Sequence, residues 1–307
     1  MSAQTVLFDA PGPRARRRQL VLGVVGVAVI AGLLALVLRK MAEASQLDPD
    51  MWTPFLRPQA WVSYLIPGLI GTLQATVLSV LLAGVYGLLF GAGRLSNNVW
   101  IRRASGVVVE FFRAVPVLIM MIFVATVLND GRWFIPSLNP LIAVVTALTL
   151  YNGSVIAELV RSGVHALPAG QREAGLSLGL TQGQTLRLVQ LPQALVAMLP
   201  ALIGQLVVVL KDTALGYGIL YNDLLNWSKT LGSAYANTVP AYLVAAALYI
   251  VINYGVTKLA SFVEHRLTRS RLTAGPVTTA APNIIQGVAE PGAPGIGSAR
   301  PDAARTL

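Results

Sequence analysis

Charged side chains interrupt three strongly apolar segments of this sequence. They are the pair Glu110 and Arg113, the pair Glu158 and Arg161, and the run Lys211, Asp212 and Thr213. An ionised group among lipid-facing residues is costly, so such a group normally faces a charged partner or a water-filled path. The chemistry that these residues indicate is therefore the binding and passage of a polar solute rather than the making of a covalent bond.

Two interpretations of the Glu/Arg pairs stay open. A spacing of three residues puts both members on one face of a helix, which fits an ion pair near its cytoplasmic end, but the same residues would also suit a solute path. The third run is the stronger candidate for a path, because Gly216 and Gly218 follow it and suit a broken helix beside a cavity. The candidate substrate-path residues are Lys211, Asp212, Thr213, Glu158 and Arg161.

A second candidate site is the stretch 171–192, which is too polar and too interrupted by glycine to cross a bilayer. Pro168 suits the first turn of a helix, and Gly179 stands where a left-handed cap would end it. Thr181 and the glutamine three residues later form a capping box that would begin a second helix. Pro192 is predicted to end this unit, because its ring cannot continue an ordinary helical ladder. The stretch therefore predicts two short helices with a bend, a docking element at a membrane surface.

Membrane helices must position these sites. The chain of 307 residues is 55% hydrophobic and 12% charged, and its apolar residues come in long blocks; this pattern is typical of membrane spans. The predicted spans cover about residues 20–38, 66–90, 106–128, 138–160, 195–210 and 239–262. Residues 211–237 are predicted to be partly re-entrant and 272–307 to be disordered. We expect the first span to be retained; cleavage after Ala42-Glu43-Ala44 as a signal peptide is the alternative.

Charge placement predicts topology. The net charge is +10, but the basic residues form short clusters between apolar blocks without interleaved aromatic residues, which argues against nucleic-acid binding. The positive-inside rule puts both termini and the docking stretch in the cytoplasm. The chain has no cysteine, so a disulfide framework, a thiol nucleophile and a Cys-ligated metal site are excluded. His165 and His265 are interpreted as polar interface residues, not metal ligands.

Six positions in the docking stretch match a known motif. They are Glu173, Ala174, Gly175, Gly179, Leu191 and Pro192. This stretch resembles the EAA loop of ABC-importer permeases, the cytoplasmic coupling helix that sits in a groove of the ATP-hydrolysing subunit. Gly175 replaces the usual second alanine and lowers local helix stability, although it stays small, and Val189 replaces the usual isoleucine.

Four further stretches extend the resemblance over about residues 66–262. They are GTLQATVLSVLLAGVYGLLFGAGRLS, VEFFRAVPVLIM, AELVRSGVHALPAGQREA and QLVVVLKDTALG. They look like the polar-amino-acid branch of these permeases, although Arg161-Ser162-Gly163 departs from the family's usual R-G-G. The opening LFDAPGPRARRR resembles the longer permease subunit of glutamate importers, which implies glutamate or aspartate as cargo.

The resemblance implies an all-α membrane protein with the type I ABC-importer permease fold and about six transmembrane helices. The expected domains are a head with the first span (1–65), a permease core (66–265) with its coupling loop (165–192), and a cytoplasmic tail (266–307). Glu173 would pair with the ATPase groove, Gly179 would permit the bend, and Leu191-Pro192 would join the element to the fifth span.

The expected partners are an ABC ATPase dimer, a second and different permease subunit, an extracytoplasmic amino-acid-binding protein, the amino-acid substrate and the lipid bilayer of a bacterial cell. A second copy of this chain is the alternative permease partner. The sequence has no G-x-x-x-x-G-K-[ST] phosphate loop, so we expect ATP to be bound by the partner, with no cofactor and no catalytic residue here. An ion-gradient-driven secondary transporter and a non-transporting membrane scaffold are the competing hypotheses.

Overall fold

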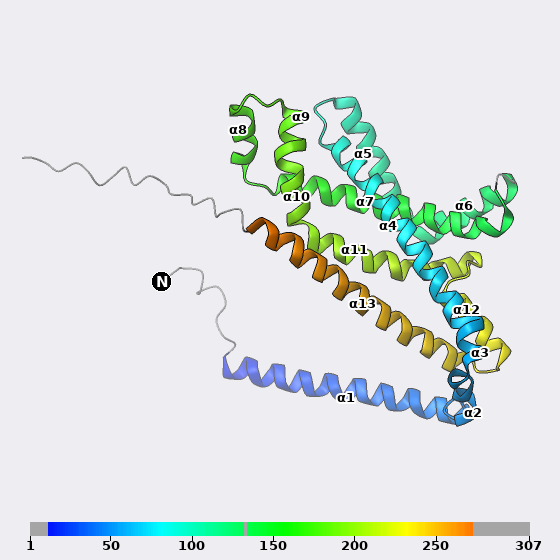
Figure 1. Ribbon diagram of the computed structural model, residues 1–307. Coiled ribbons are helices and arrows are strands. Elements are labelled where there is room, and N and C mark those ends of the chain that lie inside the picture. The colour runs from blue at the N-terminus through cyan, green and yellow to red at the C-terminus, as the bar shows by residue number, and fades with distance from the viewer. Residues whose placement is uncertain (1–11, 132–133, 273–307) are drawn as a thin grey trace, which may run out of the picture. The chain divides into compact units, whose positions relative to one another are not determined.

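The computed structural model describes residues 12–131 and 134–272, and every regular element in these ranges is helical (Figure 1). The first half of the chain holds α1 (Pro13–Glu43), α2 (Pro49–Trp52), η2 (Thr53–Leu56), α3 (Pro58–Ala60), η3 (Trp61–Leu65), α4 (Ile66–Arg94), α5 (Val99–Ala114), α6 (Val117–Gly131) and η4 (Pro136–Leu138). The second half holds α7 (Asn139–His165), α8 (Ala169–Ser177), α9 (Gln182–Thr185), η5 (Leu186–Gln190), α10 (Leu191–Ala197), α11 (Leu199–Asp212), η6 (Thr213–Ile219), α12 (Leu224–Ala234) and α13 (Thr238–Leu272). The tail predicted to be disordered lies, from residue 273 on, outside the described residues.

Five helical stretches of the described chain are long and apolar enough to cross a membrane, and the number rises to six if the bent pair α5–α6 is one span. The five are Arg14–Glu43, Pro58–Arg94, Pro136–His165, Leu199–Ile219 and Thr238–Glu264. This result agrees with the predicted all-α class and its number of spans. Most of the stretch 211–237, which was predicted to be partly re-entrant, folds as the short helices η6 and α12.

The third predicted span, 106–128, is not one straight helix. The chain turns by 100° between α5 and α6, and Val115 at the turn has an extended backbone with φ −81° and ψ 126°. Pro116 explains this conformation, because a proline ring disfavours the helical region for the preceding residue and removes a helical hydrogen bond. The turn leaves Arg113 at the end of α5, beside the break.

A seam of small residues joins α4 and α7. Along α4, Ala83, Gly87 and Gly91 recur every four residues and are buried, so they form one narrow face of the helix. A Cβ added at Gly91 would lie 2.8 Å from Cβ of Val160 in α7, closer than side chains allow. The two backbones therefore approach because glycine is present, and α5, α6 and α11 pack against this pair.

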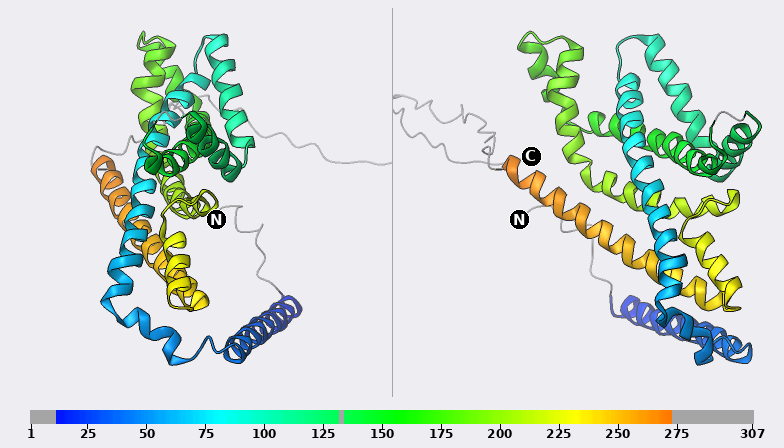
Figure 2. Two further views of the ribbon diagram at one scale, coloured as in Figure 1. Left: turned by 90° about the vertical axis from the view of Figure 1, so that its right-hand side faces the viewer. Right: turned by 45° about the vertical axis from the view of Figure 1, so that its right-hand side comes forward.

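Polar contacts fasten α12 to the start of α4. The backbone N–H of Leu224 donates to Oγ1 of Thr72 at 3.0 Å, and the hydroxyl of Tyr221 donates to the carbonyl of Gly71 at 2.7 Å. Asp223 is buried and caps α12 by accepting from the N–H of Asn226 at 2.9 Å. Figure 2 shows α12 at the opposite end of the structure from α8 and α9. The structure thus has two distinct ends joined by the long helices.

Candidate functional site

The predicted docking element folds as two short helices around a left-handed glycine. Gly179 has φ +80°, the only positive value among the glycines of the described chain. The N–H of Leu180 donates to the carbonyl of Gly175 at 3.2 Å, and that of Gly179 to the carbonyl of Leu176 at 3.0 Å. These two hydrogen bonds together form a Schellman cap, in which glycine is favoured because it has no Cβ. The predicted C-cap is confirmed.

The second helix of the element begins as the sequence indicates. The N–H of Gln184 donates to Oγ1 of Thr181 at 3.3 Å, and Oε1 of Gln184 accepts from the N–H of Thr181 at 2.8 Å. The capping box is therefore complete. Pro168 lies at the N-cap of α8, one residue before the predicted first-turn position.

The packing around Gly175 explains why glycine replaces the motif's usual alanine at this position. It is buried against Thr185 of α9, and an added Cβ would lie 2.6 Å from Cγ2 and 2.9 Å from Oγ1 of that threonine. Alanine would push the two helices apart, so this chain needs the smaller residue for the observed packing. Gly175 therefore costs α8 some intrinsic stability but permits tight contact between α8 and α9.

Pro192 does not end the unit as predicted. The chain continues through it into α10, because residues Leu186–Gln190 form a π-helical turn before it. In this turn the N–H of Leu191 donates to the carbonyl of Leu186, five residues earlier, and Pro192 occupies the first turn of α10, where its missing N–H is tolerated. Gln193 of α10 also donates from Nε2 to Oε1 of Gln171 in α8 at 3.0 Å. The docking element is therefore connected to α10 without a break.

Large leucine side chains stand exposed on the outer surface of the element. Glu173 and Ala174 are exposed, and Leu178 is 82% exposed and Leu188 66%. Among the described residues the carboxylate of Glu173 has no cation within ion-pair distance. A free carboxylate beside exposed leucines is typical of a surface that contacts another protein.

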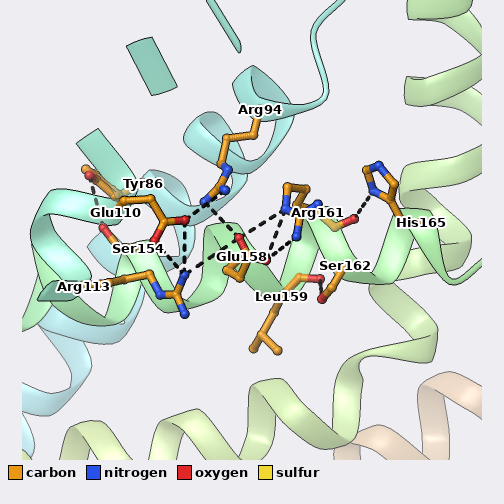
Figure 3. A network of polar contacts seen from close by, with 10 residues as sticks. All are labelled: Tyr86, Arg94, Glu110, Arg113, Ser154, Glu158, Leu159, Arg161, Ser162 and His165. Atoms are coloured by element: carbon orange, nitrogen blue, oxygen red, sulfur yellow. Dashed lines mark hydrogen bonds and ion pairs between the residues drawn. The ribbon is translucent and has the colours of Figure 1, made fainter. Parts of the chain in front are cut away.

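The two Glu/Arg pairs belong to one network that joins α4, α5 and α7 (Figure 3). Arg94, at the end of α4, lies 3.0 Å from Glu110 and 2.9 Å from Glu158. Glu158 also binds Arg161 at 2.6 Å, and Arg113 lies 3.4 Å from Glu110 and 4.0 Å from Glu158. The contacts of Glu110 with Arg113 and of Glu158 with Arg161 agree with the ion-pair interpretation. Arg94 adds ion pairs between different helices. The network therefore ties the end of α4 to both α5 and α7.

Arg113, Tyr151 and Asp212 line a cavity of about 330 Å³ at the break between α5 and α6. Asp212 is the last residue of α11, and after it the chain tightens into the 3₁₀ turns of η6. The cavity therefore presents a cation and an anion together, the two charges that an amino acid's own carboxylate and ammonium groups would meet. Its size lies within the range of about 300–1,000 Å³ typical of small-molecule sites.

The other predicted path residues lie elsewhere. Lys211 is exposed, whereas Thr213 is buried and donates its hydroxyl to the carbonyl of Leu210 at 2.7 Å. Glu158 and Arg161 belong to the ion-pair network, so of the predicted set only Asp212 lines this cavity. The sequence left a path role open for Arg113 without listing it among the candidates, and it gave no indication of Tyr151. The sequence feature that could have indicated a helix break beside Arg113 is Pro116, three residues later.

A family model described as "Binding-protein-dependent transport system inner membrane component" matches residues 75–269 of the chain. The chain belongs to this family. It is 46% identical over 226 residues to the glutamate transport system permease protein GluD of Corynebacterium glutamicum, covering 74% of this chain and 83% of the relative. It is 29% identical over 208 residues to the glutamate/aspartate import permease protein GltK of Escherichia coli, covering 66% and 93%.

Solved structures give the same fold. One chain of an "amino acid ABC transporter with histidines" superposes with a TM-score of 0.62 at 31% identity, covering 69% of this chain and 98% of that one. An inward-facing MetNI methionine ABC transporter chain has a TM-score of 0.57 at 23% identity and supports the fold alone. Together the comparisons confirm the resemblance to amino-acid ABC permeases and the type I permease fold: this chain is the membrane component of an amino-acid ABC importer.

Proposed function

We propose that this permease carries an acidic amino acid, glutamate or aspartate, into the cell, driven by a separate ATPase that grips the α8–α9 element. The observation that carries the coupling role is the bent helix pair around Gly179, which presents the free carboxylate of Glu173 beside exposed leucines. ATP binding would close the ATPase dimer, and α8 would pass that movement through η5 and α10 to α11.

Charge supports the proposed orientation. The arginines at the start of α1, those between α4 and α5, and those around α8 fall on one side if the spans alternate, so both termini and the docking element would be cytoplasmic. ATP would then be bound by the partner, with no cofactor in this chain. The second permease subunit is proposed to be a different chain.

The cavity at the α5–α6 break supports the proposed cargo. An acidic amino acid carries two carboxylates and one ammonium group, and Arg113 with Asp212 supplies one partner for each sign of charge. The names of the glutamate and aspartate relatives point to the same solute class. The cavity would hold the solute after the extracytoplasmic binding protein releases it.

The coupling role predicts that Glu173→Lys and Gly179→Asp each abolish uptake while membrane insertion stays intact. The first reverses the charge offered to the ATPase, and the second puts a side chain at φ +80°, where the Schellman cap favours glycine. Uptake of labelled glutamate would be measured with the ATPase and binding protein co-expressed, alongside the amount of permease in the membrane.

Matched controls separate coupling from general damage. Glu264→Lys makes the same charge change on α13, and Gly12→Asp adds the same side chain at the exposed N-cap of α1, where an added Cβ meets no other part of the chain within 4 Å; both should retain uptake. Normal uptake by well-expressed Glu173→Lys and Gly179→Asp would contradict the coupling role. Uptake by the purified chain alone would instead support the secondary-transporter alternative.

A further inference from the structure

A second cavity, of about 400 Å³, lies beside the docking element rather than in the solute path. Its walls come from the end of α4 and the following loop, the end of α7, the start of α8, and the segment α9–η5. The cationic side chains of its lining are Arg94, Arg102 and Arg172, and His165 lines it as well. The lining contains no aspartate or glutamate.

Two of these cations lack an anionic partner. Among the described residues, neither Arg102 nor Arg172 has a carboxylate within ion-pair distance. Arg102 donates one hydrogen bond, from Nη1 to the carbonyl of Ser96 at 2.8 Å, which leaves most of its five donors unused. Arg94 differs, because Glu110 and Glu158 already neutralise it.

The start of α8 also favours an anion. Nδ1 of His165 donates to the carbonyl of Arg161 at 2.7 Å, so the ring is held by α7 and is not counted among the cations of the cavity. Ala169, the first residue of α8, reaches the cavity, and that helix has no acidic residue in its first turn. Like charges gathered without a counter-charge repel. Arginine donors match carboxylate and phosphate oxygens in pairs.

We propose that this cavity is a binding site for a small anion that bears a carboxylate or phosphate group, and that the bound anion ties α8 to the start of α5. Arg102 belongs to α5 and Arg172 to α8, so one anion held by both would connect the docking element with the membrane helices. The site is separate from the solute cavity and goes beyond the proposed transport function.

The test uses the purified full chain in phosphatidylcholine nanodiscs at constant ionic strength. Inorganic phosphate and L-glutamate would be titrated while thermal unfolding is followed, with neutral L-glutamine and chloride as reference solutes. We expect at least one of the two anions to raise the melting temperature saturably. The double variant Arg102→Gln/Arg172→Gln should weaken that apparent affinity by about tenfold or more, because two charge-assisted contacts are lost.

The matched control is Arg103→Gln/Arg187→Gln, which removes the same charge from neighbouring positions outside the cavity lining and should bind as the parent does. Nanodiscs containing phosphatidylglycerol distinguish the source: if they abolish the phosphate shift in the parent chain, the natural occupant is a lipid headgroup, and otherwise it is a free anion. The proposal is overturned if no anion or anionic lipid binds, or if both double variants lose affinity equally. Loss of uptake by Glu173→Lys would leave this result unaffected.

Discussion

Arg113 takes part in two arrangements. Its Nη1 lies 3.4 Å from Glu110 in the ion-pair network, and its side chain also lines the cavity that contains Asp212. One guanidinium group cannot serve both fully, so a carboxylate that enters the cavity competes with Glu110. Solute binding in this cavity, as proposed, would thereby be linked to the contacts that hold α4, α5 and α7 together.

We expect Arg113→Gln and Asp212→Asn each to raise the KM for uptake about tenfold or more, because each removes a charged partner of the solute. Arg113→Lys should lose less, since lysine keeps the charge without the fork of donors. The measurement is glutamate uptake into proteoliposomes with saturating binding protein, and Arg103→Gln, outside the cavity lining, is the control. An unchanged KM in both variants would remove Arg113 and Asp212 from the solute path.

The helices differ in how far the sequence predicts them. The Gly179 cap and the Thr181 capping box were predictable, because their partners lie within five residues. The 100° turn at Pro116 was missed because an apolar run looks continuous to hydropathy. The π-helical turn before Pro192 and the contact of Gly175 with Thr185 depend on packing around the bend. Nothing local to Arg113 shows that Asp212, almost a hundred residues later, shares its cavity.

A Gly→Ala substitution in α4 should change the melting temperature in opposite directions, depending on whether the glycine lies in the seam with α7. Gly84→Ala should raise the melting temperature, because no atom lies within 4 Å of the added methyl group and alanine favours a helix by up to about 1 kcal/mol. Gly91→Ala should lower it by a few degrees, because the methyl group meets Val160 and overpacking costs about 1–3 kcal/mol. Thermal unfolding of both purified variants checks this. Equal shifts would show that the seam tolerates a wider separation.

For the molecule as a whole, the two ends of the long helices have different proposed surroundings. The docking element lies at one end, and α2 and α12 lie at the other (Figures 1 and 2). The basic cavity is lined in part by the docking element. The first end would meet the ATPase, and the second would meet the binding protein. The class, the number of spans and the family follow from the sequence, whereas the division between the two ends rests on charge placement.

The absence of cysteine makes that division directly testable. Leu178→Cys on the docking element and Leu56→Cys in η2 are both more than four-fifths exposed in the parent chain. An impermeant maleimide should label Leu56→Cys in intact cells and Leu178→Cys only after the membrane is opened. Labelling of Leu178→Cys in intact cells would reverse the proposed orientation and exclude a cytoplasmic ATPase as its partner.

The π-helical turn Leu186–Gln190 holds one more residue than an ordinary turn of the same height. An α-helix advances about 1.5 Å and rotates about 100° with each residue. If that turn tightened, α8 and α9 would shift and swivel by about one such step relative to α11. The connection between the ATPase and the transport helices would then have two discrete conformations. A force applied to Glu173 would switch between them in one step rather than bend the helix gradually.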